Sequence, residues 1–160
     1  MGVKHTVVDS PVGPLTLVRD GAALIGLYFD RHLRPPRLTD RGPRADDGFD
    51  AAIRQLGQYF AGTRREFDLE LAPRGSEFEK QVWALLTKIP YGETRTYGEL
   101  ARALGRPSAS RAVGAANGQN PLAIVVPCHR VIGADGTLTG YAGGIERKQT
   151  LLEIEQDALF

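Results

Sequence analysis

The only cysteine of the chain, Cys128, lies in the segment IVVPCHRVIG (residues 124–133), directly before His129 and Arg130. A thiolate is the reactive form of cysteine, and an imidazole titrates near neutral pH, so the pair has the residue types of nucleophilic catalysis. A lone cysteine beside a run of valines is, however, more often a small side chain in a hydrophobic core. The local sequence therefore leaves two interpretations open, a nucleophile and a core residue.

For Cys128 and His129 to act together, their side chains must reach the same side of the backbone. Pro127 lacks a backbone donor and indicates that a strand ends at the thiol. Adjacent side chains of an extended chain point to opposite faces, so the pair needs a turn or a bridging water. A Cys/His pair usually has a third, orienting group, and the acids of the last helix are the candidates. Glu153 and Glu155 lie two residues apart on different helix faces, so at most one of them points inward.

The start of the chain has the pattern of a small sheet. Short apolar runs bounded by Pro, Gly or Asp predict a three-stranded antiparallel meander, formed by VKHTVVDS, LTLVRD and LIGLYFD. Residues 31–48 carry Pro, Gly and charge without an apolar period, which predicts a surface loop. A helix is expected over residues 49–60, followed by a strand at EFDLEL (residues 66–71). The expected apolar face of that helix consists of Ile53, Leu56, Tyr59 and Phe60.

Helical signals dominate from about residue 75 onward. Ser76 with Glu79, and Thr96 with Glu99, form two capping boxes. The first box opens an amphipathic helix around Trp83, and the second opens the short helix YGELARAL. This change of pattern predicts two domains, residues 1–74 and residues 75–160.

The next helix-breaking residues predict a helix-turn-helix. Gly105 and Pro107 end the helix YGELARAL, and Ser108 is expected to cap the next one, ASRAVGAAN. Two short helices joined by a tight turn are typical of a DNA-binding helix-turn-helix and of many other helical domains. A hairpin turn is predicted at Asp135–Gly136, and a last helix over residues 145–156.

Composition indicates an ordinary globular protein. Of 160 residues, 42% are hydrophobic and 24% charged, and no apolar run approaches the roughly 20 residues of a membrane span. One cysteine allows no intrachain disulfide and no zinc site of the usual spacing, so we expect no metal and a cytoplasmic location. The net charge is +1, but residues 84–133 hold six Lys or Arg against two Glu, an excess of +4 that permits a phosphate partner.

Several motifs around Cys128 and in the helices before and after it resemble those of a known family, the O6-alkylguanine-DNA alkyltransferases. The similar motifs lie between residues 78 and 155, and they are SRAVG, NGQNP, PCHRVIG, GYAGG and LLEIE. The resemblance implies an α+β protein. Its N-terminal domain is expected to be a small ribonuclease H-like antiparallel sheet with a helix. Its C-terminal domain is expected to be a winged helix-turn-helix that carries the reactive cysteine.

The resemblance also implies a role for each matching residue. Cys128 corresponds to the alkyl acceptor, His129 to the base that takes its proton through a water, and Glu155 to the acid that orients the histidine. Asn120 corresponds to the residue that braces the active-site turn. Tyr97 corresponds to the hydroxyl that supports the guanine as it leaves.

Further residues are implied to bind the substrate and the DNA. The substrate-binding set, besides Tyr97, is Val131, Tyr141, Ala142 and Lys148. The DNA-binding set, in which the arginine replaces the flipped nucleotide in the stack, is Thr96, Ala109, Ser110, Arg111 and Gly114.

The implied function is DNA repair by a single, stoichiometric alkyl transfer from O6-alkylguanine, and on the same resemblance O4-methylthymine, to Cys128. The implied partner is duplex DNA bound through its minor groove, with no cofactor and no membrane. A monomer that can cluster along DNA is expected.

Two other functions use the same residues. A non-catalytic lesion-binding module of this fold would have the acceptor cysteine replaced, which the intact PCHR motif contradicts. An unrelated cysteine hydrolase would also use a Cys/His/acid set, but it would not need the asparagine, tyrosine and arginine positions.

Overall fold

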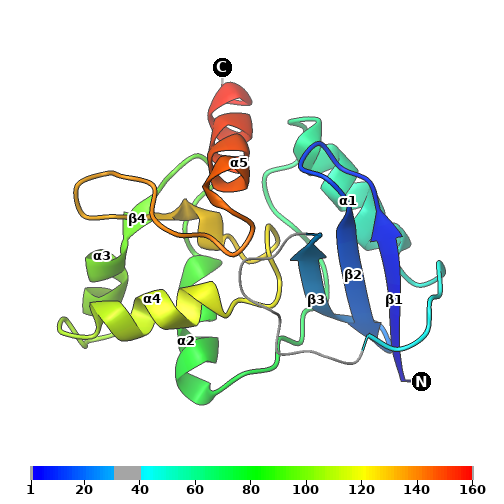
Figure 1. The fold of residues 1–160 in the computed structure, drawn as a ribbon, viewed down its shortest axis with the longest axis horizontal. Coiled ribbons are helices and arrows are strands. Elements are labelled where there is room, and N and C mark those ends of the chain that lie inside the picture. The colour runs from blue at the N-terminus through cyan, green and yellow to red at the C-terminus, as the bar shows by residue number, and fades with distance from the viewer. Residues whose placement is uncertain (1, 31–40, 160) are drawn as a thin grey trace.

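The structure is a computed structural model that describes residues 2–30 and 41–159. Its first half holds the strands β1 (Val3–Val8), β2 (Leu15–Asp20) and β3 (Ala23–Phe29) and the helix α1 (Asp50–Phe60). The strands pair antiparallel in the order β1-β2-β3, as the predicted meander requires. The helix α1 lies against this sheet (Figure 1).

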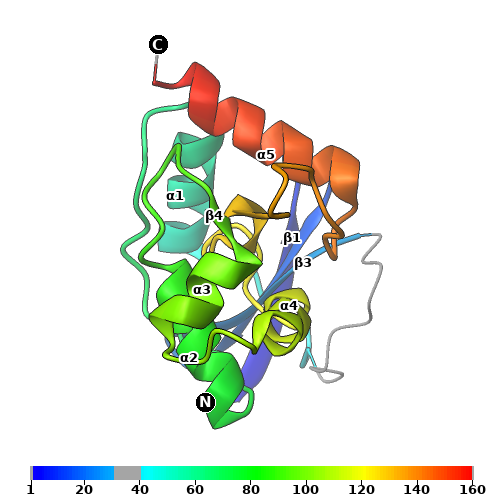
Figure 2. The same cartoon turned by 90° about the vertical axis from the view of Figure 1, so that its left-hand side faces the viewer.

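The second half is mostly helical. Its elements are α2 (Glu77–Leu86), β4 (Arg95–Thr96), α3 (Tyr97–Ala103), α4 (Ser110–Gly118), a 3-10 turn (Cys128–Arg130), β5 (Val131–Ile132) and α5 (Ile145–Asp157). Helices α3 and α4 lie side by side, with α2 packed on α4 (Figure 2). Sheet, helices and turns together confirm the expected α+β class.

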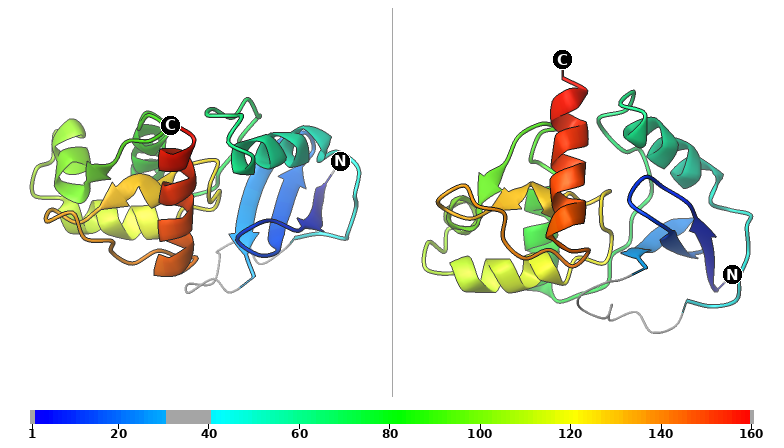
Figure 3. Two further views of the ribbon diagram at one scale, coloured as in Figure 1. Left: turned by 90° about the horizontal axis from the view of Figure 1, so that it is seen from above. Right: turned by 45° about the horizontal axis from the view of Figure 1, so that its top comes forward.

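The two halves share one hydrophobic core. Side chains of β2 and β3 point into it, including the fully buried Leu17 and Leu27, and Trp83 of α2 and Leu151 of α5 join them. Helix α5 lies over the junction of the halves (Figure 3). The free edge of β3 is used twice: Leu24 pairs with the backbone of residues 70–72, and Leu27 with that of residues 121–123. The sheet thus holds directly the segment that leads to Cys128.

Two expectations for the first half were wrong. Ile53 is 38% exposed, whereas the buried face of α1 is Ala52, Gln55, Leu56 and Tyr59, which recur at helical spacing. A polar residue takes the inner position because the Gln55 amide bonds both backbone groups of Asp68, at 3.0 and 2.8 Å. The strand expected at residues 66–71 is absent for the same reason, and only a bridge at Leu71 remains.

The capping boxes at Ser76 and Thr96 are confirmed, but Ser108 caps nothing. Helix α4 begins at Ser110 after Ala109, without a side-chain cap. Ala109 N–H donates to the Arg106 carbonyl at 2.9 Å, which closes a tight turn around Ser108.

The predicted turn at Asp135–Gly136 is present, and the Gly133 N–H closes it by donating to the Thr137 carbonyl at 2.9 Å. Among the described residues, no strand follows the turn before α5, so it does not join two paired strands, and β5 pairs with β4 instead. Of the predicted loop, residues 31–40 lie outside the described residues, and residues 41–48 are irregular and joined to His5 by backbone hydrogen bonds. Within the described ranges, no helix has the length and apolar composition needed to cross a membrane.

Candidate active site

The 3-10 turn at Cys128–Arg130 provides the reversal that the sequence required. Cys128 is 4% exposed and His129 is fully buried, so the turn carries both side chains into the interior. The approach is strained, since Ile124 has a φ of 72°, which is unfavourable for a β-branched residue. Backbone bonds from Val125 to Ala123 and from Ala123 to Leu27 enforce it. Such strain is typical of functional sites and is maintained by the surrounding fold.

Asn120 ties this turn together. Its Nδ2 donates to the Val126 carbonyl at 2.9 Å and lies 3.1 Å from the Cys128 Sγ. Its Oδ1 accepts from the Leu122 N–H at 3.0 Å. One buried amide therefore fixes both the backbone before the thiol and the thiol itself, as the family resemblance implies for a bracing residue.

The electrostatics of the thiol are set by its burial. Burial raises the pKa of Cys128, while the Asn120 amide, the Tyr141 hydroxyl and the Lys148 charge each lower it. The Tyr141 hydroxyl acts as a polar neighbour of the thiol, and it has no hydrogen-bond partner of good geometry among the described residues. Lys148 is itself fully buried, and burial lowers its pKa to about 8 although Cys128 acts in the opposite direction. Its Nζ donates to the Thr139 carbonyl at 3.3 Å.

His129 is held as a neutral imidazole. Its Nε2 lies 2.7 Å from the Glu155 Oε2, which fixes the proton on Nε2. Burial lowers the pKa of His129, and the Glu155 carboxylate only partly opposes this shift. Nδ1 is buried without a hydrogen-bond partner among the described residues. The imidazole thus keeps an unshared electron pair on Nδ1.

Glu155 is hydrogen-bonded to three buried side chains, those of His129, Arg130 and Tyr59. Arg130 donates to both of its oxygens, from Nε at 2.8 Å and from Nη2 at 3.1 Å, and the Tyr59 hydroxyl donates to Oε2 at 2.7 Å. Glu153, two residues earlier, is exposed. Although burial alone raises the pKa of Glu155, its bonds to His129 and Arg130 lower it to about 2.

Sequence reasoning missed two members of this network. Arg130 is part of the PCHR motif, and its position directly after His129 is the sequence signal that could have found it. Tyr59 gave no signal, since it lies 96 residues from Glu155 and was expected only on an apolar helix face.

The depressed pKa of Glu155 predicts an acid-sensitive stability. The carboxylate contributes stability above its ordinary pKa of 4.5, and this contribution is lost as the pH falls toward about 2. We expect the free energy of unfolding, measured by urea titration at a series of pH values, to fall through this window. The fall should be clearly smaller in Glu155→Gln, and an identical pH dependence in both proteins would contradict the assignment.

A cavity of about 250 Å³ lies beside Tyr141, the tyrosine whose hydroxyl is a neighbour of the Cys128 thiol. It is lined by Tyr97, Gly114, Asn117, Gly118, Gly140, Tyr141 and Ala142. The predicted substrate residues Tyr97, Tyr141 and Ala142 therefore meet in one place, whereas Val131 and Lys148 are buried outside the lining. The Tyr97 hydroxyl lies 2.7 Å from the Thr139 Oγ1.

The lining also holds residues that were not predicted to bind substrate. Asn117 and Gly118 belong to the NGQNP motif that carried the family resemblance, so they could have been included. Asn117 Nδ2 reaches the Cys128 carbonyl at 3.5 Å, which links the cavity to the turn.

The residues predicted to contact DNA gather at α3 and α4. Arg111 is exposed on the first turn of α4, with Ala109 and Ser110 directly before it and Gly114 one turn later. Thr96 caps α3, where its hydroxyl accepts from the Glu99 N–H. The Gly114 position, without a side chain, borders the ring of Tyr97.

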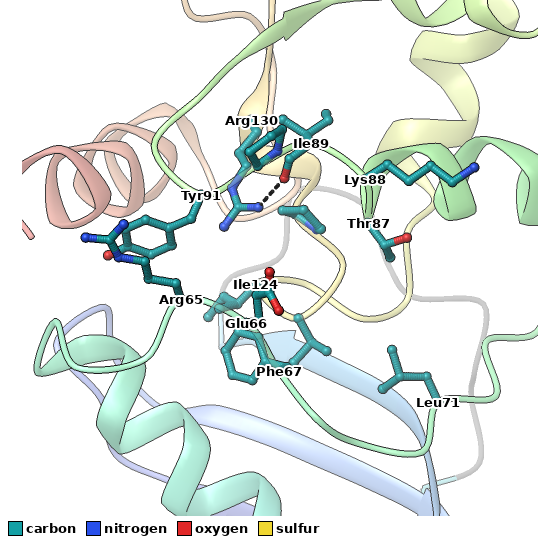
Figure 4. A pocket seen from close by; sticks show the side chains of 13 residues that line it. Arg65, Glu66, Phe67, Leu71, Thr87, Lys88, Ile89, Tyr91, Ile124 and Arg130 are labelled. Atoms are coloured by element: carbon teal, nitrogen blue, oxygen red, sulfur yellow. Dashed lines mark hydrogen bonds between the residues drawn. The ribbon is translucent and has the colours of Figure 1, made fainter. Parts of the chain in front are cut away.

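A second cavity, of about 590 Å³, lies between the two halves and is lined in part by Arg130 (Figure 4). Arg130 Nη1 donates to the Ile89 carbonyl at 2.7 Å, and Arg65 and Arg130 each lie 5.6 Å from the centre of the Tyr91 ring. No cysteine, histidine or tyrosine of the thiol site lines this cavity. Among the described residues, no group of three or more His, Cys, Asp or Glu could hold a metal ion.

Known protein families match both halves of the chain. Residues 3–73 match the ribonuclease-like domain of the 6-O-methylguanine DNA methyltransferases, and residues 77–157 match their DNA binding domain. A methylated-DNA–protein-cysteine methyltransferase of Mycolicibacterium paratuberculosis is 56% identical over 156 residues, covering 96% of this chain and 93% of the relative. One of Methanosarcina acetivorans is 50% identical over 151 residues, covering 94% of this chain and 97% of the relative.

A solved structure has the same fold. Mycobacterium tuberculosis OGT in complex with DNA superposes with a TM-score of 0.91 at 53% identity, covering 97% of this chain and 94% of that chain. Identity at this level over nearly the full length, together with matches to both domain families, leaves one assignment. The chain belongs to the 6-O-methylguanine DNA methyltransferase family.

Proposed function

We propose that this protein repairs O6-alkylguanine in duplex DNA by transferring the alkyl group to Cys128, once per molecule. The single observation that carries the proposal is the buried arrangement around the thiol. Asn120 contacts Sγ at 3.1 Å, and the next residue, His129, is oriented by Glu155 at 2.7 Å. Relatives that share half or more of the sequence are named for transfer from methylated DNA to a protein cysteine.

The reaction begins with a proton transfer. His129 Nδ1, whose electron pair has no partner in the described chain, accepts the thiol proton through a water. Glu155 then faces an imidazolium and stabilises its charge. Lys148, whose charge lowers the pKa of the thiol, stabilises the thiolate that forms.

Alkyl transfer is an in-line displacement at carbon. The thiolate forms an S–C bond as the C–O6 bond breaks, and the electron pair of that bond remains on the guanine. Tyr97, which lines the cavity, donates a hydrogen bond to the departing base and stabilises its charge. The product at Cys128 is a thioether, which neither hydrolysis nor thiols reverse in a cell. Each molecule therefore reacts once and needs no cofactor.

The target base must leave the duplex before it can reach the buried thiol. Rotating a nucleotide out of the stack costs a few kcal/mol, less when alkylation has already weakened its pairing. We propose that α3 and α4 bind the minor groove and that the exposed Arg111 enters the stack in place of the nucleotide. The small residues at the start of α4 let its backbone approach the DNA closely.

Arg111→Ala tests this step. We expect transfer from a duplex containing O6-methylguanine to slow by about 10- to 100-fold, because flipping loses its compensating contact. Transfer from the same lesion in a single strand should change by less than about threefold, since no flipping is needed there. Arg54→Ala, at an exposed position of α1, is the matched control and should leave both rates unchanged. Equal losses on duplex and single strand would contradict the flipping role of Arg111.

The chain divides functionally into residues 1–74 and residues 75–160. It acts in the cytoplasm, where the lone thiol stays reduced. It is a monomer in solution and can cluster along DNA, and O4-methylthymine is a second substrate.

A stoichiometric repair assay tests the proposed function. An oligonucleotide with O6-methylguanine is titrated with protein, and the remaining lesion is measured by chromatography of the nucleosides. We expect lesion to disappear in a one-to-one ratio with protein and then stop. Repeated turnover, or tight binding with no loss of lesion, would contradict the proposal, as would ester or peptide hydrolysis in place of transfer.

A further inference from the structure

Tyr59 connects the first half of the chain to the reacting groups. It lies in the last turn of α1 and is fully buried. Its hydroxyl donates a hydrogen bond to the Glu155 Oε2 at 2.7 Å. The same oxygen accepts from His129 Nε2 at 2.7 Å. One carboxylate oxygen is therefore shared by the proposed base and by a side chain from the opposite half of the molecule.

The Tyr59 ring is fixed in this position by its neighbours. Its centre lies 5.3 Å from that of Phe60, 5.6 Å from that of Phe67 and 6.2 Å from that of Tyr91. Burial, and next the Glu155 charge, raise the pKa of Tyr59 far above its ordinary value. The hydroxyl is thus a permanent and rigid donor.

We infer that Tyr59 is a positioning residue for alkyl transfer, which acts through Glu155 to hold His129 in its neutral, accepting form. This inference rests on the proposed roles of His129 and Glu155. A carboxylate oxygen that already accepts a strong hydrogen bond attracts the imidazole proton less. It therefore orients Nε2–H without drawing a second proton onto the ring at Nδ1. Without the hydroxyl, the remaining negative charge would favour imidazolium and raise the pKa of His129.

The other groups that face His129 and Glu155 do not replace this donor. Arg130 makes its shorter bond, 2.8 Å, to Oε1 and reaches the shared Oε2 only at 3.1 Å, compared with 2.7 Å for Tyr59. The Gly92 N–H reaches Oε1 alone, at 3.4 Å. The Lys148 charge and the Arg130 charge lower the pKa of His129 from other directions. Tyr59 is the neutral donor that competes with His129 for Oε2 within the described chain.

Tyr59→Phe removes one oxygen atom and tests the inference through the pH dependence of transfer. We expect the single-turnover rate to fall about tenfold near about pH 6 but less than about twofold near about pH 8, because the acid limb of the profile moves to higher pH. Tyr28→Phe removes a hydroxyl from a buried tyrosine on the other face of the sheet and is the matched control. Its profile should coincide with that of the unchanged protein.

A titration of the free protein provides the second measurement. Nitrogen-15 NMR of the imidazoles follows the protonation of His129 without DNA, and Tyr59→Phe should shift its midpoint to higher pH. An unshifted midpoint, or a rate loss equal at all pH values, would overturn the inference and leave Tyr59 as a packing residue. His129→Phe separates this failure from a failure of the proposed function: an unchanged transfer rate in that variant would remove the base role itself.

Discussion

The Cys128→Ser variant is expected to lose all measurable alkyl transfer, a fall of at least about 10³-fold, and still bind lesion-containing DNA. A serine hydroxyl stays protonated beside a neutral imidazole, and it is a poor nucleophile toward an alkyl carbon. The substitution removes little volume, so Asn120 can still bond the side chain and brace the turn. Binding is unaffected because the exposed face of α3 and α4 is unchanged.

The measurement pairs two assays on one protein. Lesion loss is followed by chromatography, and DNA binding by fluorescence anisotropy of a labelled duplex. We expect the affinity to stay within about threefold of that of the unchanged protein. Residual transfer would show that another group accepts the alkyl group, and lost binding would show that the thiol site and the DNA surface are not separable.

The Glu155→Gln variant is expected to lose both stability and activity. Arg130 is 6% exposed, and its guanidinium would remain buried without a counter-charge. Breaking a buried ion pair in this way costs about 3 to 5 kcal/mol. His129 would lose the carboxylate that orients it, so transfer should slow by about 10²-fold or more even at temperatures where the variant is folded.

Glu153→Gln is the matched control for this prediction. It makes the same chemical change two residues earlier on α5, at an exposed position. Urea unfolding should show a free energy within about 0.5 kcal/mol of that of the unchanged protein, and repair should proceed at the original rate. Equal stability of Glu155→Gln and Glu153→Gln would contradict the view that Glu155 neutralises a buried arginine.

Local patterns predicted the elements of the fold well. The meander follows from alternation between breakers, and α2 and α3 follow from capping boxes that form as expected at Ser76 and Thr96. The predicted inner face of α1 was wrong because a distant partner decided the outcome. Gln55 occupies the inner face of α1 because its amide binds Asp68, and no local period reveals such a bond.

The prediction of the site residues depended on the family resemblance more than the prediction of the fold did. Local reasoning reached Cys128 and His129 but could not choose between Glu153 and Glu155, and the structure places Glu155 against the imidazole. Tyr59 could not be predicted, because its contact with Glu155 arises only when α1 and α5 pack together. The required turn was anticipated, but its form depended on the strained Ile124 and on pairing with β3.

The mass of the tryptic peptide of residues 112–130, which contains Cys128, tests the central claim most directly. The protein is incubated with excess duplex carrying O6-methylguanine, digested, and analysed by tandem mass spectrometry. We predict that every molecule gains one methyl group and that the fragments place it on Cys128. An unmodified Cys128 in a sample that has removed the lesion, or a methyl group on another residue, would contradict the account.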